Sequence, residues 1–342
     1  MEAYTYVYRG GLIENRHKVS LAVVGPQGHL LAYSGNPYLT AHMRSSAKPF
    51  QALALYLSGA LVRFGITPAE VALTCASHDG MEQHVAIAAN YLHKIGLDTT
   101  YLACGAHPPF DPTSRKALQQ AGLSPTVLHN NCSGKHIGML AAARAMGVEP
   151  RGYEQPEHPV QQLNLQTMRD LSGQPHIPYG MDGCSVPTFV LPLASAARMF
   201  AVLADPKAAP IRYQEALEAV FRAMRQHPDL VAGPRSIDTV LMQTISHLLA
   251  KRGADGYYGM ALRETRWGPI GIALKVESGS NEAREPMVIR LLEELGLLSP
   301  EVELEWRRPI VRNVRKLEVG HLEAGLVLCW VQDKSPALGP GK

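Results

Sequence analysis

Two residues near the start of the chain, Ser45 and Lys48, have a spacing that suits nucleophilic catalysis. Residues three apart in a helix lie one turn apart on the same face, so the hydroxyl and the amine are expected within hydrogen-bond reach. A serine becomes a nucleophile when a neighbour takes its proton, and a neutral lysine in apolar surroundings can do so. The apolar run 50–57 would provide such surroundings. The spacing alone also fits a first-turn serine near a solvated lysine.

Four further polar clusters are expected where elements end, at residues 77–80, 130–136, 182–184 and 251–253. Each has an ordinary alternative: a helix N-cap, a turn, buried free thiols, or a basic helix end. Together they follow the order of the serine β-lactamase boxes, Ser-x-x-Lys, a later serine in a tight loop, and Lys-x-Gly near a late strand. That match is loose, because the second box is not Ser-x-Asn and the third is Lys-Arg-Gly.

The composition is that of a globular protein of one or two domains. Of 342 residues, 46% are hydrophobic and 18% are charged, and the net charge of +3 argues against nucleic acid or an anionic membrane as a partner. Five cysteines do not indicate a disulfide framework. We see no signal peptide at residues 1–6 and no apolar run of the roughly 18 residues that span a bilayer. These features predict a soluble cytoplasmic protein.

Predicted strands gather at both ends of the chain and predicted helices in the middle. Strands are expected at 19–24, 30–33, 257–261, 270–276 and 314–322, and the run 71–76 has strand length. Helices are expected at 82–95, 114–121, 137–146, 160–171, 193–203, 213–225, 240–249 and 286–295. This order predicts an α/β (α+β) fold, with a helical lobe, about 51–234, between the two parts of a mixed-sheet lobe, about 1–50 and 235–330. Both lobes would form one catalytic domain, 1–330, followed by a flexible tail, 331–342.

Taken together, the polar motifs resemble the asparaginase II family, the rhizobial inducible type of L-asparaginase. The motifs are Arg-Ser-Ser-Ala-Lys-Pro at 44–49, Ser-His-Asp-Gly at 77–80, Asn-Asn-Cys-Ser-Gly-Lys-His at 130–136 and Asp-Gly-Cys at 182–184. The resemblance runs from about the first strand to about Leu322, and 130–136 is its most specific part. It implies a serine β-lactamase-like fold, in agreement with the two predicted lobes, and a homodimer.

The resemblance also implies roles for single residues. The catalytic roles belong to two serine–lysine pairs, Ser45 with Lys48 and Ser77 with Lys251. Lys275, which also lies near a strand end, is the alternative to Lys251. The substrate-binding residues would be Arg44, Asp182 and His136. One zinc ion per chain, structural or substrate-positioning, would be held by Cys132, Lys135 and Cys184.

These roles predict the hydrolysis of L-asparagine to L-aspartate and ammonia through an acyl-enzyme. Ser45 would attack the side-chain amide carbon, Lys48 would accept its proton, and water would release aspartate. One alternative is a β-lactamase-like amidase or esterase acting on another small acyl compound, glutamine included. A second alternative is a zinc-supported amino-acid-binding protein without turnover, against which the intact Ser45, Lys48 and Ser77 argue.

Overall fold

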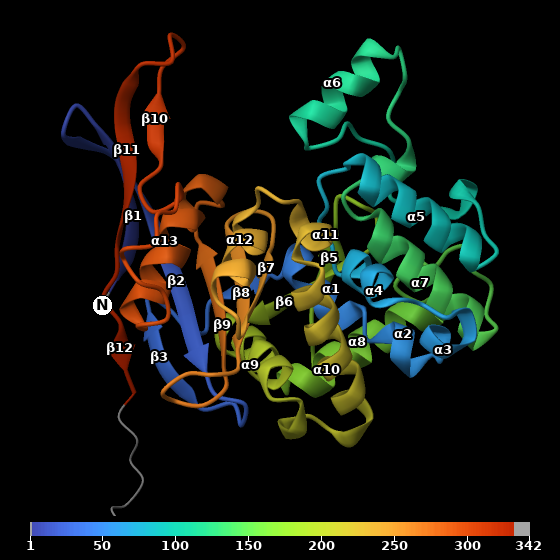
Figure 1. Cartoon of the computed structure of the whole chain (residues 1–342). Helices are drawn as coiled ribbons and strands as arrows, with labels where there is room; N and C mark the ends of the chain where they lie inside the picture. The colour runs from blue at the N-terminus through green and yellow to red at the C-terminus, as the bar shows by residue number, and fades with distance from the viewer. Residues whose placement is uncertain (1, 332–342) are drawn as a thin grey trace, which may run out of the picture.

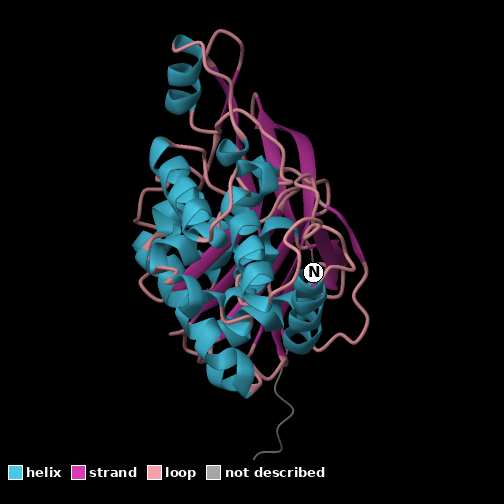
Figure 2. Cartoon of the chain, turned by 90° about the vertical axis from the view of Figure 1, so that its right-hand side faces the viewer, coloured by secondary structure: helices cyan, strands magenta, loops and turns pink. Residues whose placement is uncertain are grey.

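Strands from both ends of the chain come together in one sheet, and the helices between them form a second lobe beside it (Figure 1). The structure, a computed structural model, describes residues 2–331. With the helical lobe turned toward the viewer, the strands lie behind a broad layer of helices (Figure 2). The predicted α/β class, with terminal strands around a helical lobe, is confirmed. The predicted tail, 331–342, lies outside the described residues apart from Val331.

The main sheet has nine strands in the order β10-β11-β1-β2-β9-β8-β7, with β3 joined to β2 and β12. Its strands are β1 (Ala3–Arg9), β2 (Leu12–Val24), β3 (Leu30–Ser34), β7 (Leu248–Arg252), β8 (Tyr257–Leu262), β9 (Ile270–Val276), β10 (Ile310–Arg312), β11 (Glu318–Gly325) and β12 (Cys329–Trp330). The pairings between these strands are all antiparallel, so the sheet is antiparallel and not mixed as predicted. Residues 19–24 of β2 are all buried, and Leu21 lies opposite Leu274 of β9. Such aliphatic and β-branched runs suit a covered sheet, which is why both segments are recognisable in the sequence.

The rest of the chain is mainly helical. The helices are α1 (Lys48–Gln51), α2 (Ala54–Leu57), α3 (Ala60–Phe64), α4 (Pro68–Thr74), α5 (Glu82–Lys94), α6 (Pro112–Gln120), α7 (Ser133–Met146), α8 (Pro159–Ser172), α9 (Leu193–Ala204), α10 (Ile211–Gln226), α11 (Pro228–Ala232), α12 (Ile237–Thr244) and α13 (Asn281–Glu294). A 3-10 turn, η1 (Arg44–Ala47), leads directly into α1. A small sheet is formed by β4 (Thr40–His42), β6 (Pro187–Pro192) and β5 (Tyr179–Met181). No helix in residues 2–331 has both the length and the apolar character to cross a membrane.

Two glycines allow α9 to lie directly on the sheet. A Cβ at Gly271 would come within 2.0 Å of the Ala197 carbonyl oxygen, and a Cβ at Gly259 would come within 2.1 Å of the Phe200 ring. The helix therefore packs closely on β9, β8 and β2. Phe200 in turn meets the ring of Phe50 in α1, edge to face, with centroids 5.1 Å apart. This packing seats α1, which carries Lys48, against the sheet lobe.

The sequence-based interpretation of residues 71–76 as a strand is wrong, because most of this run belongs to helix α4. The Thr67 side chain accepts a hydrogen bond from the Glu70 amide, and the Glu70 carboxylate accepts one from the Thr67 amide. This capping box starts a helix at Pro68. The helix is then buried between α7 and α10, so its apolar run lacks the one-sided pattern of a surface helix.

The predicted helix 240–249 is also wrong in its second half. Helix α12 ends at Thr244 and strand β7 begins at Leu248. The guanidinium of Arg225 donates to the carbonyl oxygens of Met242, Ile245 and Leu248, which stabilises the non-helical backbone between the two elements. Lys251 consequently lies in a strand, not beyond the end of a helix.

Candidate active site

Ser77 lies between two buried lysine amines that come from helix α1 and strand β7. Lys48 Nζ donates to Ser77 Oγ at 3.0 Å, and Lys251 Nζ donates to the same oxygen at 3.1 Å. Lys48 also donates to the carbonyl oxygen of Ala76, and Lys251 to that of Arg252. The two lysines are 1% and 0% exposed. A hydroxyl held by two buried amines is well placed to exchange protons with them.

Of the two lysines that the sequence left open, Lys251 is the one that meets Ser77. The Lys275 amine donates instead to the backbone carbonyl oxygens of Asp255 and Val276. Lys251 lies in β7, where it pairs with Gly259 of β8, and its amine is 3.9 Å from the buried carboxylate of Asp238. Burial lowers the pKa of Lys251 to about 7, against the attraction of Asp238 and together with the positive charge of Lys48. A substantial fraction of this amine is therefore neutral near pH 7.

Ser45 is half-buried in η1 and lines a cavity of about 410 Å³ together with Ser77. Among the hydrogen bonds of residues 2–331, none joins the Ser45 hydroxyl to Lys48, contrary to what the spacing predicts. The reason is that the Lys48 amine is taken by Ala76 and Ser77 on the neighbouring loop. The two serines thus share a cavity, and Ser77 holds the contacts to both amines.

Close backbone packing fixes η1 against the end of β7. Ser46 Oγ donates to the carbonyl oxygen of Lys251 at 2.7 Å. A Cβ on Gly253 would lie 2.7 Å from the Met43 carbonyl oxygen, so a glycine is needed at this position. The position of Ser45 relative to Lys251 is therefore set by the backbone as well as by side chains.

The motif at 77–80 is tied to the motif at 130–136. The amide of His78 donates to the Asn131 carbonyl oxygen at 3.2 Å, and its ring Nε2 lies 2.9 Å from the Ser133 hydroxyl. Burial lowers the pKa of His78 well below its usual value, so the ring is neutral at physiological pH. Gly134 allows α7 to pack closely on α4, which precedes this loop, because a Cβ there would lie 2.2 Å from the Leu73 carbonyl oxygen.

Of the three residues expected to bind the substrate, Arg44 and Asp182 contact each other, whereas His136 contacts Tyr153. Arg44 Nε donates to Asp182 Oδ1 at 2.9 Å, and Arg44 also pairs with Asp255. Burial raises the pKa of Asp182, but the charges of Lys135 and Arg44 outweigh it and hold the pKa below the usual value. His136 is fully buried, with Nδ1 at 2.5 Å from the Tyr153 hydroxyl, and its Nε2 has no partner within residues 2–331. A buried nitrogen without a partner is a group that a ligand could satisfy.

The three expected zinc ligands meet in the structure. Lys135 Nζ donates to Cys184 Sγ at 3.0 Å, and Cys184 also hydrogen-bonds Cys132. That hydrogen bond lowers the pKa of the Cys132 thiol and raises that of Cys184. The described part of the chain contains no group of three or more His, Cys, Asp and Glu side chains that could hold a metal. The two cysteine sulfurs are donors that zinc prefers. Burial lowers the pKa of Lys135, but the neighbouring Cys184, Cys132 and Asp182 outweigh it and hold the pKa above its usual value, so this amine would have to lose its proton to bind a metal.

Several residues of the cavity were not predicted from the sequence. Its wall beyond the two serines includes Asp79, Phe110, Arg252, Arg284 and Glu285. Asp79 and Arg252 belong to polar clusters that the sequence already marks, so a signal existed for them. Arg284 and Glu285 lie in the first half of α13, more than 200 residues from Ser45, and no sequence pattern links them to it.

The family model described as L-asparaginase II matches residues 5–324 of the chain. No curated protein sequence matches the chain.

Three solved structures illustrate its similarity to known proteins. Mglu in its glutamate form has a TM-score of 0.47 and 14% identity, over 84% of this chain and 63% of that chain. A Bacillus glutaminase has a TM-score of 0.39 and 12% identity, over 82% of this chain and 91% of that one. A β-lactamase from Sphaerobacter thermophilus has a TM-score of 0.42 and 14% identity, over 83% and 94%. The chain thus spans less than two thirds of the Mglu chain.

Proposed function

The chain belongs to the L-asparaginase II family, an amide hydrolase family, and we propose that it hydrolyses L-asparagine to L-aspartate and ammonia. The observation that carries the proposal is the Ser77 hydroxyl, held at 3.0 and 3.1 Å by two buried lysine amines beside Ser45. Hydrolysis of an unactivated amide needs a nucleophile and a proton donor for the leaving nitrogen, and this arrangement offers both.

In the proposed mechanism Ser45 attacks and Ser77 carries the proton. Ser45 is half-buried and faces the cavity, whereas Ser77 is only 5% exposed, and attack on a substrate carbon requires access. The Ser45 proton would pass by way of Ser77 to a neutral lysine, Lys251 or Lys48. The same relay would return it to the departing nitrogen. Water would then hydrolyse the ester between Ser45 and the aspartyl group.

Asparagine recognition is assigned to the side of the site that carries Arg44, Asp182 and His136. The carboxylate of the substrate would meet Arg44 and its ammonium would meet Asp182, which are already paired at 2.9 Å. A zwitterionic ligand can replace such an internal ion pair with two charge-assisted contacts. The unpartnered Nε2 of His136 is available to the same ligand.

We assign a structural zinc site to Cys132, Lys135 and Cys184. When bound, zinc would hold these side chains together and fix the turn at 182–184 against the first turn of α7. Asp182 and His136 are neighbours of the ligands in sequence, so the metal would position the substrate-binding groups.

Ammonia release from purified protein tests the proposal directly. We expect asparagine to be hydrolysed much faster than glutamine or a chromogenic β-lactam. Preference for either of the other compounds would support the glutaminase or β-lactamase-like alternative. Binding of asparagine without ammonia release would support the amino-acid-binding alternative. The homodimer and the cytoplasmic location stay predictions, to be checked by light scattering and by cell fractionation.

A further inference from the structure

The cavity beside the two serines is much larger than the leaving group of asparagine. It measures about 410 Å³, whereas a water molecule, close to ammonia in size, occupies about 30 Å³ of liquid. Among the described residues that line it are Asp79, Phe110 and Arg252, but Arg44, Asp182 and His136 are not. The space therefore lies apart from the groups assigned to the amino-acid part of asparagine. It is available to whatever is attached to the amide nitrogen.

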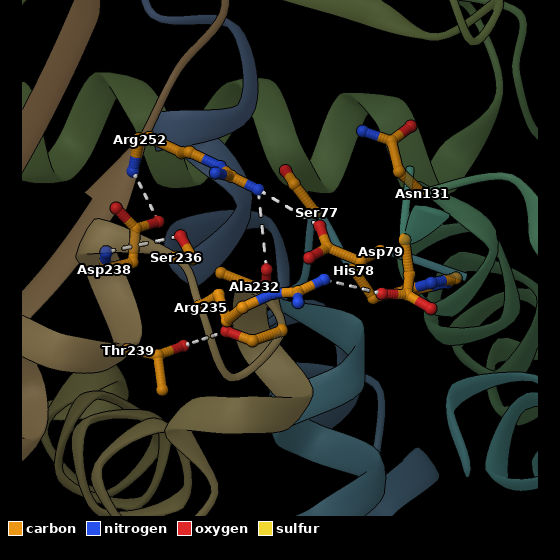
Figure 3. A network of polar contacts seen from close by, with 12 residues as sticks. Ser77, His78, Asp79, Asn131, Ala232, Arg235, Ser236, Asp238, Thr239 and Arg252 are labelled. Atoms are coloured by element: carbon orange, nitrogen blue, oxygen red, sulfur yellow. Dashed lines mark hydrogen bonds and ion pairs between the residues drawn. The ribbon is translucent and has the colours of Figure 1, made fainter. Parts of the chain in front are cut away.

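The wall of this space carries a cation with unused hydrogen-bonding capacity, Arg252. Its Nη2 lies 3.4 Å from Asp79 Oδ1 and 3.5 Å from the Ala232 carbonyl oxygen, both at the long limit of a hydrogen bond. Figure 3 shows the guanidinium beside Ser77, with these two contacts. Arg252 directly follows Lys251, and its backbone amide donates to Asp238 at 3.0 Å, so the base of the side chain is fixed.

Two other arginines near the serines are more fully engaged. Arg44 is paired with both Asp182 and Asp255. Arg284 is 3% exposed and donates to Gly253, Asn281 and Glu285 at 2.9, 2.9 and 3.3 Å. Arg252 is the arginine with donors left for a ligand, and its side chain is 26% exposed. A guanidinium in this state binds a carboxylate with two parallel hydrogen bonds.

We propose that this cavity accepts the leaving group of L-β-aspartyl peptides, with Arg252 binding the carboxylate of the departing amino acid. In these substrates a second amino acid is joined through its nitrogen to the side-chain carbonyl of aspartate. Asp79 keeps the guanidinium in place, and the half-exposed ring of Phe110 packs against the side chain of the leaving residue. The inference rests on the proposed function, because it uses the same serines and the same aspartyl part.

The reaction differs from asparagine hydrolysis only in what leaves. Ser45 Oγ forms an ester bond with the side-chain carbonyl carbon, and the bond from that carbon to nitrogen breaks. The proton lost by Ser45 returns through Ser77 to the leaving nitrogen, so a free amino acid departs. Water then cleaves the ester, gives aspartate and restores the Ser45 hydroxyl.

The test compares three substrates by one readout, the release of aspartate: L-asparagine, L-β-aspartyl-glycine and L-β-aspartyl-glycinamide. The two dipeptides differ only in the carboxylate that Arg252 would bind. We expect kcat/KM for the glycine compound to exceed that for the glycinamide compound by about ten-fold or more, the usual effect of a hydrogen bond to a charged group. This comparison needs only the wild-type protein.

Two variants connect the preference with Arg252. In Arg252→Gln we expect the ratio of the two dipeptide rate constants to fall to about one, and Arg252→Lys should recover part of it. The control is Arg235→Gln, which removes a nearby arginine that is 72% exposed and paired with Asp111, and it should keep the wild-type ratio.

Three results overturn the inference. One is a wild-type protein that hydrolyses asparagine but neither dipeptide, which leaves the proposed function intact. Another is equal cleavage of the glycine and glycinamide compounds. The third is an Arg252→Gln variant that loses asparagine and dipeptide hydrolysis to the same extent, because Arg252 would then bind the aspartyl part. Cleavage of the glycine dipeptide without asparagine hydrolysis would overturn the proposed function alone.

Discussion

At the scale of single residues, the site depends on which serine hydroxyl contacts the buried lysine amines. Ser77 contacts both lysines, yet Ser45 is more open to the cavity. The spacing of Ser45 and Lys48 predicted a direct pair, whereas in the structure the Lys48 amine donates to Ser77. The sequence could not reveal this, because Ser77 is brought in by tertiary packing of α4 and α7.

Ser45→Ala and Ser77→Ala should differ in kind as well as in rate. We expect Ser45→Ala to lose on the order of a thousand-fold or more in kcat, because the covalent intermediate cannot form. Ser77→Ala should lose about a hundred-fold, as for a proton-transfer group, and should still form the intermediate. Rapid quenching with asparagine, followed by mass spectrometry, measures the aspartyl adduct. An adduct on Ser77 in the Ser45→Ala protein would reverse the two roles.

Activity should rise with pH around neutrality. The pKa of Lys251 is about 7, lowered by burial and by the charges of Lys48 and Arg252, and raised by Asp238. The amine accepts a proton only in its neutral form, and that fraction grows as the pH passes through the pKa. We therefore expect kcat/KM for asparagine to increase from pH 6 to pH 8 with a midpoint near 7. Lys251→Met should remove this rise together with most of the rate. A wild-type profile that falls steadily above pH 7 would instead favour a histidine base.

At the scale of elements, the approach of α7 to α4 positions the catalytic loop. Gly134 faces the Leu73 backbone, whereas Gly138, one turn later, faces the Thr74 side chain, whose Cγ2 would lie 2.5 Å from an added Cβ. The two glycines are suitable for comparison, since both lie in α7 and alanine favours the helix at each. An added Cβ would have to displace the Leu73 backbone at Gly134, but only the Thr74 side chain at Gly138.

Gly134→Ala should therefore destabilise the protein more than Gly138→Ala. Overpacking of a core commonly costs about 1–3 kcal/mol, and we expect Gly134→Ala at the upper end of this range. It should also lower kcat, because moving Leu73 displaces the loop that carries Ser77. Urea unfolding and asparagine turnover of both variants provide the measurement. Equal losses for the two would mean that the Leu73 backbone is not the limiting contact.

The proposed zinc site links two elements and gives a prediction of its own. Cys184→Ser should lower the zinc content and raise the KM for asparagine more than it lowers kcat, because Asp182 lies two residues away. Cys329→Ser is the control, since this thiol lies in β12. Elemental analysis and steady-state kinetics check both variants. Wild-type protein that contains no zinc after incubation with the metal would remove the site and leave the serine–lysine chemistry unaffected.

Strands with a clear residue pattern were predictable, whereas elements decided by a helix cap or by distant contacts were assigned wrongly or missed. The runs 19–24 and 270–276 are strands because their residue types suit a covered sheet. The run 71–76 is equally apolar, and the capping box at Thr67 and Glu70 makes it helical. The break between α12 and β7 depends on Arg225, about 20 residues earlier, which no local pattern contains. Likewise, Glu285 enters the cavity wall only through the packing of α13.

At the scale of the whole molecule, the active site needs both halves of the chain. Lys48 and Ser77 come from the first quarter of the sequence, and Lys251 comes from strand β7 in its second half. The polar motifs at 44–49 and 251–253 flank the helical region, and those at 77–80, 130–136 and 182–184 lie within it. The sequence could not show which late lysine completes the site, because Lys251 and Lys275 both lie in strands and differ only in where their side chains point.

The placement of β2 between β1 and β9 has a consequence for the synthesis of the protein. The Ser20 hydroxyl donates to Glu277, which lies 257 residues further along the chain. On the ribosome, β1 and β2 emerge first, and β2 must keep an unpaired edge until β9 has been made. Open strand edges invite pairing with other chains, and contacts of such long range form slowly. Nascent chains of this protein should therefore depend on chaperones until translation has passed β9.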